Sequence, residues 1–341
     1  MSSAGVELAA KDGPQKPPPR AASAGPAMIE VQELRKFYGS FEALKGISFT
    51  VGRGEIVGLL GPNGAGKTTT MKILTGYISA TSGWFGVAGF DGFKDSLSVR
   101  KNIGYLPENA PLYPDMGIVE YLKFVCEVRR IPRRERKERI DKMIQLVGLT
   151  PMVRKNIGEL SKGFRQRVGL AQAMIHEPPV LILDEPTSGL DPNQIVEIRK
   201  LIKDLGENRT IILSTHNLPE VRMTCSRMII ISNGRKVADG SAEELERDGR
   251  EATRLQLTVK LGSAAEAEVV AAQLGQIDKV ANVTQLGQAG SNQWQFAVDS
   301  MGNADLRPAV YDVVKGEGWG LLELRTDVMD LEKIFHKLTQ Y

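Results

Sequence analysis

The strongest constraint on the fold is a series of short apolar runs that alternate with stretches of helical pattern. The runs include IEVQEL, EIVGLLG, VLILDE, TIILST and RMIIIS, and each has the length of a single β-strand. Strands that alternate with helices along a chain assemble into a sheet covered by helices. The sequence therefore predicts an α/β fold over residues 28–242.

The composition fits a globular protein and narrows the class only a little further. The 341 residues are 42% hydrophobic and 25% charged, with a net charge of +3, which neither favours nor excludes a nucleic-acid partner. At this length we expect one large core and a second, small domain.

No apolar stretch reaches the roughly 18 residues of a membrane-spanning helix, and no signal-peptide core opens the chain, so a cytosolic protein is expected. Cys126 and Cys225 show no ligand spacing and are expected to be buried free thiols.

Two segments differ from the sheet pattern. Residues 1–27 are rich in Ala and Pro and lack an apolar period, which predicts a disordered tail. Residues 117–148 are helical in pattern and highly charged, with Pro132 between two helices, as expected of a helical subdomain inserted into the sheet domain. The basic run at residues 129–139 is expected on a solvated face, with an acidic partner as the alternative.

Residues 243–341 predict a second, smaller domain. Their pattern gives strand, helix, strand, strand, helix and strand, followed by a closing helix. This is the order of a split βαβ sandwich, so we expect a small ferredoxin-like α+β domain with an accessory or regulatory role. His336 lies near Phe335 and Leu338 on the closing helix, and we expect packing or exposure there rather than metal ligation.

The segment GPNGAGKT, residues 61–68, carries the clearest chemical signal. It follows the apolar run IVGLL and precedes a helical pattern, which is the context of a phosphate-binding loop. Glycines let backbone amides turn towards the β- and γ-phosphates, and the helix start adds its positive dipole end. Lys67 supplies a cation for those phosphates, and Thr68 supplies a hydroxyl for Mg²⁺. The nucleotide-binding residues expected in this region are Gly61, Asn63, Gly64, Ala65, Gly66, Lys67, Thr68 and Thr69.

The run VLILDE supplies the carboxylates that such a site needs. It is apolar throughout and ends in Asp184 and Glu185, at the edge of a parallel sheet where ligands bind. Asp184 is placed to hold Mg²⁺ through water. Glu185, beside the γ-phosphate, is placed to orient and deprotonate an attacking water.

Three further motifs decide among the families that share such a loop. LSKGFRQRVGLAQAM begins at Leu160, where Ser161 is placed to cap the following helix and Gly163 keeps the backbone open. SGLD occupies residues 188–191, and His216 follows the apolar run TIILST. With these motifs, residues 28–242 resemble the ABC ATPase family. YLPE, LSKGFRQR and LEKIFHKLT are similar to its subgroup of gliding-motility, sodium- and drug-efflux ATPases.

The resemblance implies a P-loop ABC ATPase domain with a RecA-like core, an antiparallel β subdomain and an inserted α-helical subdomain. It implies a head-to-tail dimer in which each ATP, with Mg²⁺, lies between the phosphate loop of one subunit and the signature of a second copy. Ser161, Gly163 and Asp191 would serve that shared site, Tyr38 would stack on adenine, and His216 would contact the γ-phosphate. Such a subunit energises a separate membrane permease from the inner face of the cell membrane. The subgroup favours export, and no nucleic acid is expected.

Two positions depart from the commonest pattern of the family. Glu108 stands where a Q-loop glutamine is usual, so a metal ligand is retained but an anion is brought near the triphosphate. The signature has Lys162, Gly163 and Phe164 in place of the usual Gly-Gly-Gln. The Phe164 side chain offers no hydrogen bond, so its contribution is expected from the backbone or from packing.

Two other functions fit these motifs less well. A soluble ABC ATPase that acts on ribosomes or DNA would resemble relatives with two cassettes in one chain or a long coiled coil. The segment between the phosphate loop and VLILDE is too short and too interrupted for a long heptad array. A catalytically inactive regulatory cassette is opposed by the presence of Lys67, Asp184, Glu185 and His216.

Overall fold

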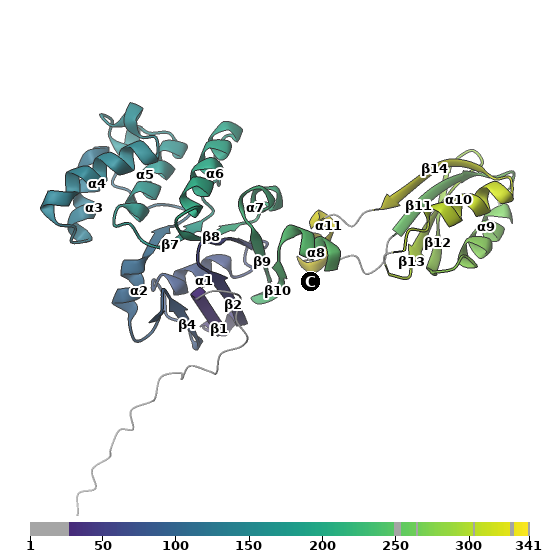
Figure 1. Ribbon diagram of the computed structural model, residues 1–341, viewed down its shortest axis with the longest axis horizontal. Helices are drawn as coiled ribbons and strands as arrows, with labels where there is room; N and C mark the ends of the chain where they lie inside the picture. Colours follow the sequence, from purple (N-terminus) through teal and green to yellow (C-terminus); the bar gives the residue numbers. More distant parts are fainter. Residues whose placement is uncertain (1–26, 249–253, 264, 303, 328–330, 340–341) are drawn as a thin grey trace, which may run out of the picture. The chain divides into compact units, whose positions relative to one another are not determined.

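The computed structural model describes residues 27–248, 254–263, 265–302, 304–327 and 331–339. The disordered tail predicted for residues 1–27 falls almost wholly on residues 1–26, which lie outside the described residues. The chain forms two compact units, of which the second spans Ala242–Lys337. The elements of each unit are labelled in Figure 1.

The first unit combines two sheets with helices. Its strands are β1 (Ala27–Tyr38), β2 (Phe41–Gly52), β3 (Ile56–Leu60), β4 (Ser82–Val87), β5 (Phe90–Asp91), β6 (Ile103–Leu106), β7 (Val180–Asp184), β8 (Thr210–Thr215), β9 (Arg227–Ser232) and β10 (Arg235–Gly240). Its helices are α1 (Lys67–Leu74), α2 (Ser96–Asn102), α3 (Ile118–Val128), α4 (Arg133–Leu146), α5 (Lys162–Met174), α6 (Pro192–Gly206) and α7 (Leu218–Thr224), with short 3₁₀ turns at Thr150–Met152 and Ile157–Glu159.

A six-stranded sheet organises this unit, with the order β10-β9-β3-β8-β7-β6. All its neighbours pair in parallel except β10, which runs antiparallel to β9. β7 and β8 are buried along their whole length, as their continuous apolar runs require in a sheet covered on both faces. The predicted α/β fold is confirmed. Because β3, β8 and β7 are neighbours, their carboxyl ends meet at one edge of the sheet.

A second, four-stranded sheet has the order β2-β1-β4-β5, and its strands are antiparallel. Between the two sheets lies α1, whose residues Met71, Ile73 and Leu74 are fully buried. They share one hydrophobic cluster with Leu59 of the six-stranded sheet and Phe49 of the four-stranded sheet. The helix that follows the glycine-rich loop is thereby packed against both sheets.

The helical segment predicted for residues 117–148 is formed by α3 and α4, which pack with α5. Pro132 stands at the N-cap of α4, where its ring ends the preceding turn without breaking a helix. Tyr121 and Leu122 of α3 and Met143 of α4 belong to a cluster that reaches β7 and β8. The helices α3, α4 and α5 lie together in Figure 1.

The second unit contains α8 (Ala242–Asp248), β11 (Arg254–Lys260), α9 (Ala265–Gly275), β12 (Val280–Gly290), β13 (Gln293–Ser300), α10 (Arg307–Gly316), β14 (Gly320–Asp327) and most of α11 (Leu331–Thr339). Its antiparallel sheet has the order β12-β13-β11-β14. One face packs on α9 and α10 around Leu257 and Phe296, both almost fully buried. Neighbouring positions carry polar pairs, such as Arg254 with Asp299 and Arg325 with Gln256.

Both cysteines are free thiols. Cys126 is buried, as predicted, but Cys225 is only partly buried as a residue, so the prediction is wrong for its exposure. The Cys225 thiol nevertheless points inward, since a Cβ added to Gly58 would lie 3.2 Å from its Sγ, and burial raises its pKa. Within the described ranges, no helix has both the length and the hydropathy needed to cross a membrane.

Candidate functional site

The site lies where β3, β8 and β7 end side by side. The glycine-rich loop follows β3, Asp184 ends β7 with Glu185 directly after it, and His216 follows β8. Residues that are more than a hundred positions apart in the chain therefore meet at one edge of the sheet. This is the edge at which open parallel sheets bind their ligands.

The loop at residues 61–68 has a backbone that side chains would disturb. Gly64 and Gly66 have φ angles of 80° and 111°, in the region that favours glycine. A Cβ at Gly66 would also lie 2.7 Å from Leu44 Cδ2. The loop leads directly into α1, whose first residue is Lys67. Its amides and the helix start are therefore arranged as an anion-binding cradle.

Lys67 is the cation at the centre of this cradle and is 6% exposed. Its Nζ donates to the carbonyl oxygens of Gly61 at 2.7 Å and Pro62 at 3.2 Å, and it lies 3.8 Å from Glu185 Oε1. Burial lowers the pKa of Lys67, while Glu185, Asp184 and Glu108 oppose that change. The ammonium is held by loop carbonyls beside Glu185, and the charges of Asp184 and Glu108 also act on it.

Asp184 is buried and joined to two hydroxyls. Thr68 Oγ1 donates to its Oδ1 at 3.3 Å, and Ser214 Oγ donates to the same oxygen at 2.5 Å. Ser214 Oγ also accepts from the backbone amide of Glu185 at 3.0 Å. One serine of β8 therefore fixes both the side chain and the backbone at the end of β7.

Glu185 and His216 contact each other within the site. His216 Nδ1 lies 3.0 Å from Glu185 Oε1 and 3.1 Å from Oε2. Burial raises the pKa of Glu185, and the contacts with His216 and Lys67 oppose this rise. Its backbone has a φ of 47°, a conformation that costs energy in a residue with a side chain. Such a carboxylate is suited to act as a general base.

A cavity of about 430 Å³ opens above these groups. Most predicted residues line it, namely Tyr38, Asn63, Gly64, Ala65, Gly66, Lys67, Thr68, Thr69, Glu108, Glu185 and His216. Gly61 and Asp184 stand behind the lining and reach it through their bonds to Lys67 and Thr68. Ser161, Gly163 and Asp191 are not part of the lining within this chain.

Aromatic side chains stand at the mouth of the cavity. Tyr38 is 48% exposed, and Lys36 Nζ lies 5.2 Å from the centre of its ring. Phe41, on the next strand, is 64% exposed and also lines the cavity. Exposed rings beside a phosphate cradle offer a flat apolar surface on which a base can stack. Sequence patterns indicated Tyr38 but missed Phe41.

The start of α5 presents the signature residues. The Ser161 side chain caps this helix by accepting from Phe164 N at 3.4 Å, which confirms the predicted cap. A Cβ at Gly163 would lie 2.2 Å from Gln194 Oε1, so the Gln194 side chain packs directly over this glycine. Asp191 caps α6 by accepting from Gln194 N at 2.9 Å. The Phe164 ring packs against the core, as predicted for this position.

Sequence reasoning missed several residues that shape the site. Ala43 and Ser188 line the cavity, and Ser214 holds Asp184, yet none of them belonged to a predicted set of site residues. Ser214 lies at the carboxyl end of the buried run TIILST, two positions before His216. A hydroxyl at the ligand-binding edge of a parallel sheet was therefore the signal that could have found it.

The described residues contain no group of three or more His, Cys, Asp or Glu side chains arranged to hold a metal. Thr68 and Asp184 instead offer a hydroxyl and a carboxylate close together. Mg²⁺ is often bound by one or two protein oxygens together with substrate phosphates and water. The donors present therefore fit an ion that arrives with a nucleotide.

Comparisons with known proteins agree with this geometry. The ABC transporter family profile matches residues 44–188. The uncharacterized ABC transporter ATP-binding protein YxlF of Bacillus subtilis (strain 168) is 39% identical over 219 residues, which cover 64% of this chain and 72% of that protein. The bacitracin transport ATP-binding protein BcrA of Bacillus licheniformis is 36% identical over 233 residues, which cover 68% and 75%.

A solved structure shows the same fold for the first unit. It is a dimeric ATP-binding cassette in a post-hydrolysis state, bound to ADP and Pi, with 25% sequence identity and a TM-score of 0.58. The match covers 63% of this chain and 98% of that one. The glycine-rich cradle, the paired carboxylates and these relatives agree: the chain belongs to the ABC transporter ATP-binding proteins and is the ATP-hydrolysing subunit of such a transporter.

Proposed function

We propose that Glu185 is the general base of ATP hydrolysis, supported above all by its contact with His216 beside Lys67. Lys67 and the amides of the loop hold the β- and γ-phosphates of the substrate. Glu185 orients the attacking water and takes its proton as the new oxygen–phosphorus bond forms. The bond between the γ-phosphorus and the bridging oxygen breaks in the same step, and ADP leaves with that oxygen. His216 holds the carboxylate in place and stabilises charge that develops on the γ-phosphate.

Mg²⁺ is the metal that suits this site. Thr68 and Asp184 would hold it together with the phosphates, and Glu108, which lines the same cavity, is a third oxygen donor. The ion would neutralise negative charge on the triphosphate. Because the Glu108 carboxylate is negative, it would repel the phosphates and attract the metal ion, so we assign it to Mg²⁺.

The active form is proposed to be a head-to-tail dimer of this chain. Ser161, Gly163 and Asp191 lie outside the cavity of their own subunit, which suits residues that serve a second copy. Ser161 and Gly163 stand at the start of α5, where amides and a dipole end favour a phosphate. A related ATP-binding cassette has been solved as a dimer.

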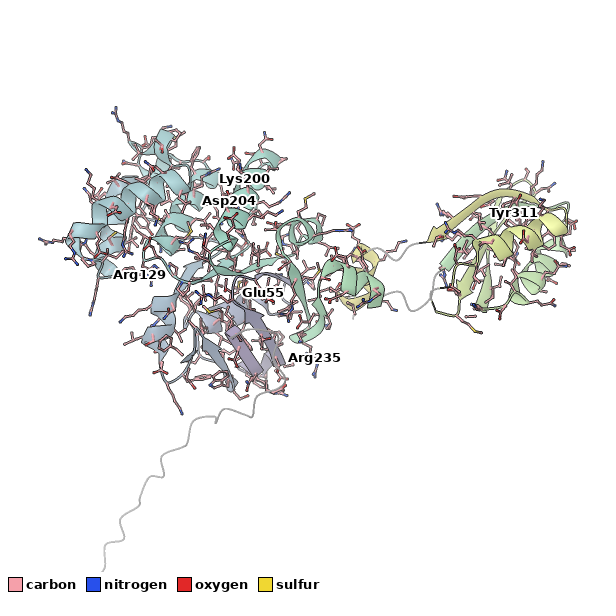
Figure 2. The ribbon with its side chains drawn as sticks, in the orientation of Figure 1. Glu55, Arg129, Lys200, Asp204, Arg235 and Tyr311 are labelled. Carbon is pink, nitrogen blue, oxygen red and sulfur yellow. The ribbon has the colours of Figure 1, made fainter. Side chains whose placement is uncertain are left out.

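A separate membrane permease is the proposed partner. A groove of about 790 Å³ is lined by exposed side chains that include Tyr77, Leu97 and Val128. Arg129, which is labelled in Figure 2, also lines this groove. Its Nη1 donates to the carbonyl oxygen of Arg100 at 3.2 Å. Exposed apolar side chains that gather with polar ones in a groove are typical of a protein interface. The groove fits a permease at the inner face of the cell membrane.

Export is the proposed direction of transport. BcrA, which is 36% identical, carries the name of a bacitracin transport protein, and a linearmycin resistance protein of Bacillus subtilis is equally similar over 234 residues. Resistance to an antibiotic is served by its removal from the cell. The substance that this chain's transporter moves would be bound by the permease.

The second unit is proposed to be a ferredoxin-like accessory domain that regulates or stabilises the dimer. Its element order and the strand order β12-β13-β11-β14 support this assignment. We propose domain limits of 28–242 for the ATP-binding domain and 243–341 for the accessory domain, with residues 1–27 as a tail.

ATP hydrolysis by the purified chain tests the shared site. Specific activity with Mg²⁺ should rise with protein concentration, because each site needs two subunits, and it should vanish in Lys67→Ala. A specific activity that is independent of concentration would contradict the dimeric site. Activity that survives Lys67→Ala would contradict the assignment of the phosphate cradle.

A further inference from the structure

Glu220 is a buried carboxylate close to the site that the proposed chemistry does not use. It lies in the first turn of α7 and is 5% exposed. Two hydroxyls donate to it: Thr187 Oγ1 to its Oε1, and Thr215 Oγ1 to its Oε2 at 2.8 Å. A buried carboxylate without such donors is strongly unfavourable, so both bonds hold it in a single position.

The two threonines belong to the two segments that carry Glu185 and His216. Thr187 follows Glu185 by two residues and immediately precedes the D-loop, residues 188–191. Thr215 ends β8 immediately before His216, and its Oγ1 also accepts from Asn217 N at 3.0 Å. Glu220 therefore bridges the segment after β7 to the segment after β8.

This bridge completes a second connection between the same segments. Ser214 Oγ already joins Asp184 and the amide of Glu185 to β8. Alternate side chains of a strand point to opposite faces, so Ser214 and Thr215 make their bonds on different sides of β8. The strained backbone of Glu185, with its φ of 47°, lies between the two connections. A strained conformation persists where the surroundings fix it from several sides.

We propose that Glu220 is a positioning residue that keeps the D-loop and His216 in a fixed relation. Through Thr187 it ties the D-loop to α7, and through Thr215 it ties α7 to His216. A displacement of the D-loop thereby reaches His216, and so the Glu185–His216 contact, inside one subunit. The inference rests on the proposed catalytic site and adds a route by which the D-loop regulates it.

Thr187→Val tests the bridge because it removes one hydroxyl at nearly constant volume. The turnover number should fall about tenfold or more, the scale of one hydrogen bond to a charged group, while the dissociation constant for ATP stays unchanged. Thr187→Ser keeps the hydroxyl and should retain most of the turnover. The matched control is Thr224→Val on α7, the helix that carries Glu220. The buried Thr224 Oγ1 has no hydrogen-bond partner in the described chain. This control should leave turnover unchanged.

Two results would overturn the bridge. One is equal turnover in Thr187→Val and Thr224→Val. The other is an equal loss in Thr187→Ser and Thr187→Val, which would assign the effect to packing. If the wild-type chain hydrolysed ATP and Lys67→Ala did not, either result would sink this inference and leave the proposed site intact.

A double-mutant cycle asks whether the bridge acts through His216. Added to His216→Ala, the change Thr187→Val should cost little further turnover, because the residue that it positions is already absent. Independent losses that multiply would instead place Thr187 on another route. Glu220→Gln is a second way to weaken the same bonds. Thermal unfolding of each variant distinguishes a loss of positioning from a loss of folding.

Discussion

Single side chains decide the chemistry at the end of β7. Glu185→Gln keeps the shape of the side chain but cannot accept the proton of the attacking water. We expect ATP binding to remain, turnover to fall by about a hundredfold or more, and the ATP-bound dimer to persist. Steady-state hydrolysis and size-exclusion chromatography with ATP would measure this. Glu207→Gln, at the exposed C-cap of α6, is the control, and unchanged hydrolysis in Glu185→Gln would remove the assigned base.

The pH dependence of turnover belongs to the same residue. Burial raises the pKa of Glu185, and a base works only when deprotonated, so activity should fall on acidification at a higher pH than for an ordinary carboxyl group. The contact with His216 lowers that pKa. Replacing His216 by Ala should therefore shift the acidic limb of the residual turnover to still higher pH. A limb that stays in place or moves down in pH would show that His216 does not stabilise the carboxylate.

Whole elements were predictable from the sequence where one apolar pattern governs them. The runs VLILDE and TIILST predicted β7 and β8, because strands buried on both faces need continuous apolar residues. The phosphate loop was predictable because its motif is local. The bridge through Glu220 was not, since Thr187 lies 33 positions away and no local pattern reports such a bond. Cys225 was predicted to be buried for its residue type, but the neighbourhood of a short helix leaves it partly exposed.

The sheet of the second unit offers a prediction at the scale of an element. Phe296 of β13 is fully buried among residues of its own unit. Phe296→Ala should destabilise that unit by about 3–5 kcal/mol, through lost contacts and a cavity. Thermal unfolding should show an earlier transition with unchanged ATP affinity, because the cavity is lined by residues of the first unit. Gln295→Ala, the neighbour on the opposite face, is the control. A parallel loss of ATP affinity would contradict this separation.

At the scale of the whole molecule, two inactive variants should restore each other. Lys67→Ala disables a phosphate loop, and Ser161→Ala disables a signature. A mixed dimer then contains one site in which both parts are intact, whereas neither homodimer does. An equal mixture should recover on the order of a quarter of the wild-type activity, if subunits exchange freely and sites act independently. Activity that stays at the level of the separate variants would argue against a site shared between two copies.

The position of β8 between β3 and β7 limits which insertions and deletions this chain can accept during evolution. Three consecutive residues at the end of β8 contact three different carboxylates: Ser214 contacts Asp184, Thr215 contacts Glu220, and His216 contacts Glu185. Inserting or deleting one residue in β8 would turn these side chains to the opposite faces of the sheet and move all three groups away from their partners at once. These contacts therefore fix the number of residues in β8. We therefore expect an added or deleted residue to be tolerated in an exposed loop but not within β8.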